Sequence, residues 1–358
     1  MKIKDFIDYE QPTDYIVESD RYSDEYRTPV LTAGQSFILG YTNEKEGIYN
    51  KCPCIIFDDF TTSVHYVDFP FKVKSSAMKI LTSKHNANLK YCYYLLLSLS
   101  KMPPNHKRQW ISTTSEKKHF LPSIDNQVSI VKQLDLVSDI ISHYTMQINY
   151  LDNLIKARFV EMFGNPFENP YELPEATLPD LGEFGRGVSK HRPRNDPKLL
   201  GGDYPLIQTG DVANADLYIS SYNATYSDLG LEQSKMWDKG TLCITIAANI
   251  AKTAILEFDA CFPDSVVGFV ANDKTSNIFI HYWFSFFQGI LESQAPESAQ
   301  KNINLKILSE LKVIVPPIEL QNEFVFFVKQ IDKSKLAVQK SLEKTQQLFD
   351  SLMQEYFG

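Results

Sequence analysis

The stretches "LPSIDNQ", Leu121–Gln127, and "VPPIELQ", Val315–Gln321, are two versions of one phrase. Each opens a long segment with helical periodicity, and both segments end on the dipeptide Phe-Gly. The offset between the two glutamines also separates the two final glycines, Gly164 and Gly358, so the segments superpose without a gap. Self-similarity at a fixed offset indicates a structural repeat. The sequence therefore predicts the same long helix twice, each preceded by a different segment.

The apolar residues of both helices recur in steps of three and four, the repeat of about 3.5 residues that forms a coiled-coil seam. In the first helix the predicted seam comprises Ile130, Leu134, Val137, Ile141, Tyr144, Ile148, Leu151 and Ile155, and then passes Arg158 to reach Met162. In the second helix it comprises Phe324, Val328, Ile331, Val338, Leu342, Phe349, Leu352 and Tyr356, with Lys335 and Thr345 as polar interruptions. Polar seam residues reduce stability but can fix the register of the helices.

Four segments follow from this repeat. Two globular heads are predicted over residues 1–121 and 165–315, and two coiled-coil helices over residues 122–164 and 316–358. The first helix leads directly into the second head, so an antiparallel pairing needs no long return connection. Such a pairing would place the heads at opposite ends, related by a pseudo-twofold axis.

The heads show short β-branched and aromatic runs, broken by Gly, Pro, Asn and Asp, and are predicted to be mixed α/β and rich in strands. The candidate strands are Pro53–Phe57, Val64–Val67, Thr241–Ile246 and Ala254–Phe258, and the candidate helices are Leu89–Leu99 and Phe279–Leu291. A weak echo relates "TPVLTAG", Thr28–Gly34, to "YPLIQTG", Tyr204–Gly210. The two heads are thus expected to share a scaffold and to differ in their loops.

Composition limits the possible functions. The 358 residues are 43% hydrophobic, which fits soluble globular domains, and carry a net charge of −8, which argues against coating nucleic acid by charge alone. No apolar run is long enough to span a membrane, and the N-terminus lacks the apolar core of a signal peptide, so a cytoplasmic location is expected. Cys52 and Cys54 have no second pair to complete a zinc set and are interpreted as ordinary cysteines.

Basic and amide side chains cluster locally, and their chemistry suits DNA. Arginine and lysine bind phosphate or guanine, and Asn and Gln can pair with adenine. Solvated loops with incidental charge are the alternative for each residue. In the second head the candidates are Arg186, Lys190, His191, Arg192, Arg194, Gln208, Thr209, Asp211, Gln300, Lys301 and Asn302. In the first head they are Thr32, Gln35, Lys107 and Arg108.

Signatures of catalysis are missing. The sequence contains no phosphate-binding loop, no dinucleotide-binding glycine motif and no Asn/Asp-Pro-Pro-aromatic tetrapeptide of amino-methyltransferases. A nuclease pattern can be assembled from Asp180, Asp196 and Lys198, but prolines place its second half in a loop rather than on a strand. No metal site is predicted, and the chain is interpreted as a reader of its ligand, without an active site.

These residues carry a resemblance to a known family over the whole chain. The helix openings at Pro122–Gln127 and Pro317–Gln321, the exit "RFVEMFGNPFENP" at Arg158–Pro170, and "GVSKHRPRNDPKLLGGDYPLIQTGDV" at Gly187–Val212 resemble the specificity subunits of type I restriction–modification enzymes. Those proteins alternate two variable target-recognition domains with two similar long helices.

The resemblance implies a non-catalytic, sequence-specific subunit that binds double-stranded DNA. Each head would read one half of a bipartite target, and the helices would set the spacer and dock two methyltransferase subunits, with motor–nuclease subunits completing the complex. No cofactor would bind this chain; S-adenosylmethionine, ATP and magnesium would belong to the partners. The alternative left open is a standalone two-headed scaffold for ligands other than DNA.

Overall fold

The computed structural model describes residues 1–32, 36–84, 86–100, 107–247, 250–294 and 305–358. The chain forms two compact units, a first unit of Met1–Met146 with Gln339–Gly358 and a second unit of Gln147–Val338. Two helices of 40 residues each, α3 (Ile124–Phe163) and α9 (Ile318–Phe357), contribute to both units. The predicted pair of equal long helices is confirmed.

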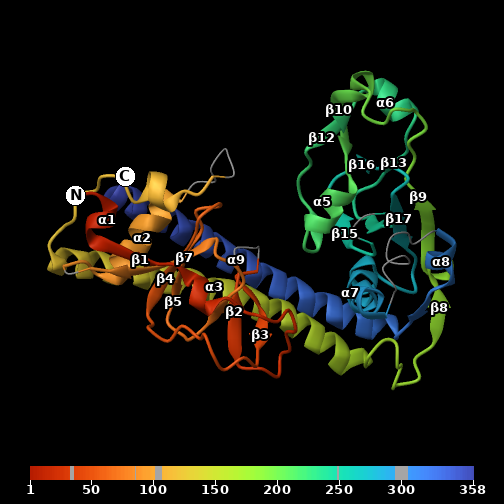
Figure 1. Cartoon of the computed structure of the whole chain (residues 1–358). Helices are drawn as coiled ribbons and strands as arrows, with labels where there is room; N and C mark the ends of the chain where they lie inside the picture. The colour runs from red at the N-terminus through yellow and green to blue at the C-terminus, as the bar shows by residue number, and fades with distance from the viewer. Residues whose placement is uncertain (33–35, 85, 101–106, 248–249, 295–304) are drawn as a thin grey trace. The chain divides into compact units, whose positions relative to one another are not determined.

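The described residues of the first unit form two sheets (Figure 1). The four-stranded sheet has the order β1 (Ile7–Glu10), β7 (Met78–Ser83), β4 (Cys54–Asp58) and β5 (Val64–Val67). The three-stranded sheet has the order β3 (Ile38–Thr42), β2 (Thr28–Leu31) and β6 (Lys72–Val73). The helical segments are α1 (Ile3–Phe6), η1 (Pro12–Tyr15), α2 (Leu89–Leu99) and η2 (Trp110–Thr114).

Strand β4 shows why this unit has two apolar cores. Its side chains alternate between the two faces of the sheet. Ile55 and Phe57 join the core that contains α2, whereas Cys54 and Ile56 join a separate core with the three-stranded sheet. All of these residues are buried, which explains a continuous apolar run in a strand covered on both faces.

The second unit also contains two larger sheets (Figure 1). One has the order β11 (Tyr218–Ile219), β15 (Thr253–Leu256), β14 (Leu242–Thr245), β17 (Val266–Ala271) and β9 (Gly182–Arg186). The other has the order β12 (Ala224–Tyr226), β10 (Leu200–Leu206), β16 (Ala260–Cys261) and β13 (Met236–Trp237). A small pair joins β8 (Glu175–Thr177) to β18 (Lys312–Ile314). The helical segments are α4 (Leu178–Leu181), η3 (Pro197–Leu199), α5 (Thr209–Asn214), α6 (Asp228–Glu232), α7 (Asn277–Gln294) and α8 (Leu305–Glu310).

The two heads repeat one topology. The order β1-β7-β4-β5 in the first head corresponds to β9-β17-β14-β15 in the second, and β3-β2-β6 corresponds to β12-β10-β16. In each head the central strand of the smaller sheet pairs with one neighbour antiparallel and with the other parallel. The weak echo in the sequence lies on these two central strands, β2 and β10. All four candidate strands and both candidate helices are confirmed, with shifts of a few residues at their ends.

In the first unit the beginning of α3 lies beside the end of α9. Val131 and Leu134 of α3 share one apolar core with Phe357 of α9. The Tyr356 hydroxyl donates a hydrogen bond of 2.7 Å to Gln133 Oε1. The helix pair in this unit is therefore antiparallel.

In the second unit the end of α3 lies beside the beginning of α9. The rings of Phe159 and Phe163 meet the Phe324 ring edge to face, with centroid separations of 5.4 and 5.6 Å. This pairing is antiparallel as well. The predicted seam continued from Ile155 past the half-buried Arg158 to Met162 and did not include Phe159, which is fully buried.

The predicted seam positions are all buried or half-buried, whereas most positions between them are exposed. The buried ones are Leu134, Val137, Ile155, Phe324 and Val328. These lie toward the heads, where the helices also pack against sheet and loop residues. The middle of each helix buries its seam only in part, as expected for two helices packed on each other alone.

The recurring glutamine explains the repeated phrase. Gln127 is fully buried, and its Oε1 accepts a hydrogen bond of 2.8 Å from the backbone N–H of Asn88. Its Nε2 donates to the carbonyl oxygens of Asn86, at 3.1 Å, and Pro122, at 2.8 Å. One side chain thus ties the start of α3 to the turn before α2.

Gln321 makes the equivalent contacts at the start of α9. Its Oε1 accepts a hydrogen bond of 3.0 Å from the Thr275 hydroxyl. Its Nε2 donates to the carbonyl oxygens of Lys274, at 3.0 Å, and Pro316, at 2.9 Å. The segment held in this case is the turn before α7. Both heads are therefore fastened to their following long helix by the same device.

Gln321→Leu is expected to destabilise the second unit by about 1–3 kcal/mol for each polar group left buried without a partner. The carbonyls of Lys274 and Pro316 would be those groups. Hydrogen exchange measured on peptides from the α9 start and from α7 checks this. The control is Gln346→Leu, an exposed glutamine of the same helix that donates a hydrogen bond to Asp350, for which a change within about 0.5 kcal/mol is expected. Equal protection in both variants would contradict the assigned role.

Candidate nucleic-acid interface

The basic stretch Arg186–Arg194 forms a loop that leaves the edge of the five-stranded sheet. Its first residue, Arg186, ends β9 opposite Val267 of β17. At Gly187 a Cβ atom would lie 2.2 Å from the carbonyl oxygen of Phe262, so a side chain there would clash. The glycine lets the chain pass close to the neighbouring strand before the loop turns outward.

Two arginines of this loop share one carboxylate. Arg192 Nη2 lies 3.7 Å from Asp264 Oδ2, and Arg194 forms an ion pair with the other oxygen. The two side chains are 55% and 46% exposed. Exposed ion pairs contribute only about 0–1 kcal/mol. Both guanidinium groups can therefore exchange this carboxylate for another anion.

The middle of the loop is held in place by its neighbours. The His191 backbone N–H donates a hydrogen bond of 3.0 Å to Gln233 Oε1, and its ring Nε2 lies 3.1 Å from Asp196 Oδ2. The hydrogen bond from the Lys198 backbone N–H lowers the pKa of the Asp196 carboxyl most, and the hydrogen bond from the His191 ring lowers this pKa further. The Lys190 side chain is exposed. Lys190 therefore faces solvent, as do His191 and Lys198.

Gln208, Thr209 and Asp211 lie at the start of α5. The Asp211 carboxylate caps this helix, since Oδ2 accepts a hydrogen bond of 2.8 Å from the Gln208 backbone N–H and Oδ1 accepts one of 3.2 Å from Asn223 Nδ2. The Gln208 side chain is exposed, and Thr209 is half-buried. Asp211 thus stabilises the start of α5. The sequence had suggested this residue only as a candidate base contact.

A cavity of about 310 Å³ brings separate candidates together. Arg194, from the basic loop, lines it together with Gln208 and Thr209, from the start of α5. Tyr226 and Ser265 also line it. Guanidinium, amide, hydroxyl and aromatic groups thus converge at one place in the second head. Such a set can bind a phosphate or the edge of a base.

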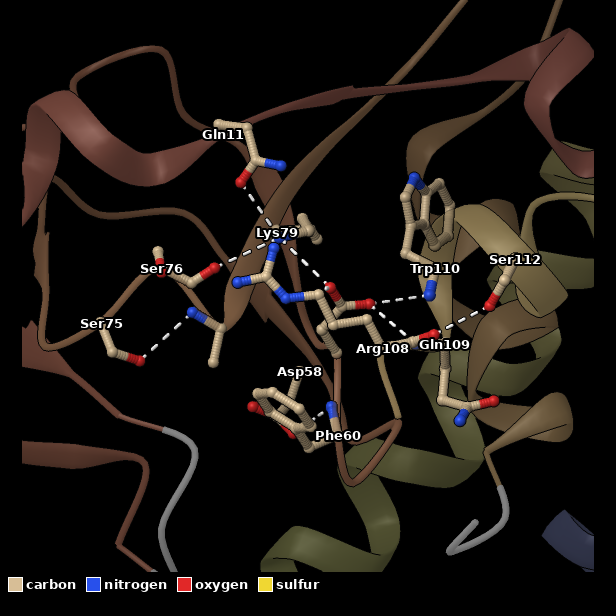
Figure 2. Close-up of polar contacts among 12 residues, drawn as sticks. Gln11, Asp58, Phe60, Ser75, Ser76, Lys79, Arg108, Gln109, Trp110 and Ser112 are labelled. Carbon is tan, nitrogen blue, oxygen red and sulfur yellow. Dashed lines mark hydrogen bonds and ion pairs between the residues drawn. The ribbon is translucent and has the colours of Figure 1, made fainter. Parts of the chain in front are cut away.

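In the first head, Arg108 lies over a buried acid (Figure 2). Its Nε is 4.0 Å from Oδ2 of Asp59, which is fully buried, while the arginine side chain is 58% exposed. Asp59 Oδ1 accepts hydrogen bonds from the backbone N–H groups of Gln109, at 3.0 Å, and Trp110, at 2.7 Å. Lys79 Nζ lies 3.3 Å from Asp59 Oδ2 and is also fully buried. The acid therefore fixes the backbone that carries Arg108.

Sequence reasoning missed both Asp59 and Lys79. The available signal was a lysine inside the apolar strand β7, because a buried charge requires a partner. Lys79 Nζ also donates to Gln11 Oε1, at 3.0 Å, and to the Ser76 carbonyl oxygen, at 3.2 Å (Figure 2). Among the candidates of the first head, Lys107 is exposed, and Thr32 follows β2 with its backbone N–H bonded to the Phe37 carbonyl.

Four further candidates, Gln35, Gln300, Lys301 and Asn302, lie outside the described residues. The structure brings together Arg194, Gln208 and Thr209, and it places Arg108 beside a residue that was not predicted.

The two acids of the possible nuclease pattern, Asp180 and Asp196, form hydrogen bonds with neighbouring residues. Asp180 Oδ2 accepts hydrogen bonds from the Thr177 hydroxyl, at 2.6 Å, and backbone N–H, at 3.1 Å. Asp196 Oδ1 accepts a hydrogen bond of 3.0 Å from the Lys198 backbone N–H. Within the described part of the chain, no group of three His, Cys, Asp or Glu side chains is arranged to hold a metal ion. All five cysteines are free thiols, and burial raises the pKa of Cys54.

Comparison with known proteins decides the family. The family model for the type I restriction modification DNA specificity domain matches residues 172–348. The specificity subunit of the type I restriction enzyme EcoR124I/EcoR124II from Escherichia coli is 31% identical over 94% of this chain and 87% of its own length. The chain belongs to the type I restriction–modification specificity subunits. It is the non-catalytic part of such an enzyme, the part that confers DNA specificity.

Solved structures show the same fold. The S subunit of a type I system from M. genitalium matches with a TM-score of 0.62 at 16% identity, covering 100% of this chain and 95% of the other. A chain from a structural study of complex assembly and conformational transition of the type I R-M system matches with a TM-score of 0.53 at 14% identity, covering 98% and 97%. This specificity subunit therefore shares the family arrangement of sheet-rich heads and packed long helices.

Across the described residues, no helix of the specificity subunit combines the length and the apolar character needed to cross a membrane.

Proposed function

We propose that each head of this specificity subunit reads one half of a bipartite double-stranded DNA target, and that α3 and α9 set the spacing between the halves. The observation that supports this most directly is the repeated topology, in which two equal scaffolds present different polar loops. Equal scaffolds with different loops allow one architecture to read two different sequences. The segments are the heads, residues 1–121 and 165–315, and the helices, residues 122–164 and 316–358.

In the second head, the proposed DNA contacts centre on the cavity lined by Arg194, Gln208 and Thr209. Arginine can grip guanine or phosphate, and glutamine can pair with adenine. The exposed Lys190 and Arg192 extend this surface toward phosphate groups. The remaining proposed contacts of this head are Arg186, His191, Asp211, Gln300, Lys301 and Asn302.

In the first head, Arg108 is the proposed central contact. Its guanidinium is exposed, while its backbone is fixed through Gln109 and Trp110 by the buried Asp59. A fixed backbone reduces the entropy lost when the side chain binds. Lys107, Thr32 and Gln35 are proposed to contribute beside it.

The helices are proposed to dock two methyltransferase subunits, which motor–nuclease subunits join for restriction. Both helices expose large apolar side chains, including Leu136 and Leu348 in the first unit and Phe326 and Leu336 in the second, with exposed fractions of 62%, 51%, 65% and 57%. Exposed apolar side chains of this size favour contact with a protein partner. S-adenosylmethionine, ATP and magnesium would bind to the partners, and the complex would act in the cytoplasm.

The test uses the specificity subunit in complex with its methyltransferase. The wild-type complex is expected to methylate adenines in a spaced, two-part sequence, found by mapping methylated bases in DNA. Arg194→Ala with Gln208→Ala is expected to relax specificity in one half only, by about tenfold to a hundredfold, the worth of one or two base contacts. Arg108→Ala is expected to relax the other half only.

Each variant serves as the control for the other. Relaxation of the same half by both variants, or unchanged specificity in both, would overturn the assignment of the heads. Methylation that stays the same when the heads are exchanged would instead favour a standalone scaffold without DNA specificity.

A further inference from the structure

Lys335 occupies a seam position of α9 where the repeat calls for an apolar residue. Its side chain is only 12% exposed, and its Nζ lies 2.5 Å from Asp152 Oδ1 of α3. The same Nζ lies 3.4 Å from Oδ2 of Asp216, in the loop that follows α5 in the second head. One ammonium group therefore joins α3, α9 and the second head.

This junction borders a polar cavity of about 380 Å³ within the second unit. Asp332, one turn before Lys335, also lines the cavity, and its buried Oδ2 has no hydrogen-bond partner among the described residues. His281 Nδ1 lies 2.9 Å from the Thr253 hydroxyl, and burial lowers the pKa of His281 to about 4, so this ring is neutral. Lys156 and Lys252 also line the cavity, and Lys335 is the lysine whose ammonium group forms ion pairs with Asp152 and Asp216.

The lysine keeps its charge in this position. Burial by itself lowers the pKa of Lys335, but the hydrogen bond to Asp152 and the charge of Asp216 outweigh it, so that the pKa is raised overall. Burial raises the pKa of Asp332. The carboxylates that Lys335 contacts come from a helix and from a head, which are separate parts of the fold.

Such a group is better suited to fixing geometry than to adding stability. Replacing a buried ion pair by apolar residues of similar size is often neutral or stabilising, whereas a polar seam residue can select one register. An apolar residue at position 335 would pack on α3 but would form no bond to Asp216. The lysine therefore fixes the position of the second head relative to the helices.

We infer that Lys335 fixes the seating of the second head on the helix pair, and thereby selects the spacing between half-sites that the specificity subunit accepts. This inference rests on the proposed function, in which the helices set the spacer. Lys335 is a positioning residue in this scheme and touches no DNA.

The experiment uses the complete methyltransferase complex and duplexes built on the site that the wild type methylates. The spacer is lengthened or shortened by one base pair while both half-sites stay constant. The Lys335→Met complex is expected to methylate the natural site but to discriminate against the altered spacers about tenfold less, a change equal to about 1.4 kcal/mol. Asp216→Asn, at a residue whose side chain is 81% exposed, removes the charge of the link to the head with little risk to folding and is expected to shift discrimination in the same direction by a smaller factor.

The matched control is Thr345→Leu, the other polar seam residue. Its hydroxyl donates a hydrogen bond of 2.8 Å to the Ser341 carbonyl of its own helix, so unchanged spacing discrimination is expected. Undiminished discrimination in both Lys335→Met and Asp216→Asn, with methylation intact, would overturn this inference alone. A wild-type complex that methylates no spaced site would overturn it together with the proposed function.

Discussion

Phe159→Ala is expected to lower the free energy of unfolding of the second unit by about 3–5 kcal/mol. The Phe159 side chain is fully buried, and its ring lies 5.0 Å from that of Phe163, 5.4 Å from that of Phe279 and 5.0 Å from that of Phe286. Truncation would remove the ring from the contact with Phe324 of α9 at the same time. Urea unfolding followed by hydrogen exchange in α3 and α7 measures the loss.

The control for this change is the adjacent Val160→Ala. Val160 is 40% exposed on the same helix, and a loss of less than about 1 kcal/mol is expected. A similar small loss for Phe159→Ala would show that the aromatic cluster does not hold the two helices to the second head.

Lys79→Met is expected to destabilise the first unit by about 3–5 kcal/mol, because it removes the buried partner of Asp59 and leaves that buried charge to the more distant and exposed Arg108. The Lys79 and Asp59 side chains are 0% exposed and 3.3 Å apart. The effect should concentrate where Asp59 holds the backbone of Gln109 and Trp110. Hydrogen exchange of those amides, together with the unfolding free energy, provides the measurement.

Two further variants make this prediction specific. Lys79→Met combined with Asp59→Asn should recover much of the loss, since the asparagine oxygen can still accept both backbone hydrogen bonds without a buried charge. Lys84→Met is the control, because the Lys84–Asp8 pair, at 3.8 Å, is exposed and contributes at most about 1 kcal/mol. If Lys79→Met cost no more than Lys84→Met, the buried pair would have no role in holding the loop.

The long helices and the strands of the heads could be predicted because their signals are local. Heptad spacing marks both helices, and the matching positions of Gln127 and Gln321 mark the two helix starts. The function of those glutamines could not be predicted, since their partners, such as Asn88 and Thr275, lie about 40 or more residues away in the chain. A recurring residue shows that a position is special but does not show what it binds.

The absence of Phe159 from the predicted seam has a physical reason. A strict heptad pattern follows a helix that packs on one partner only. Near its end, α3 packs on α9 and also on α7 of the second head, so its buried face widens to include Phe159. The core residues added by a head cannot be deduced from the repeat of the helix alone.

The candidate site was predicted in composition but not in arrangement. The basic loop and the segment from Gln208 to Asp211 were both found, yet their meeting at one cavity depends on the pairing of β10 with β16. Asp59 could not be predicted, because a single buried acid does not recur at a regular spacing in the sequence.

The pairing of Arg192 and Arg194 with Asp264 has a kinetic consequence. Asp264 supplies one negative charge for two arginines, so binding to a phosphate replaces an ion pair that already exists. Non-specific binding depends on phosphate neutralisation and counterion release, and this internal counter-charge reduces both. We therefore expect short residence at incorrect sites, which lets the complex scan a genome quickly and stop only where base contacts add to the phosphate contacts.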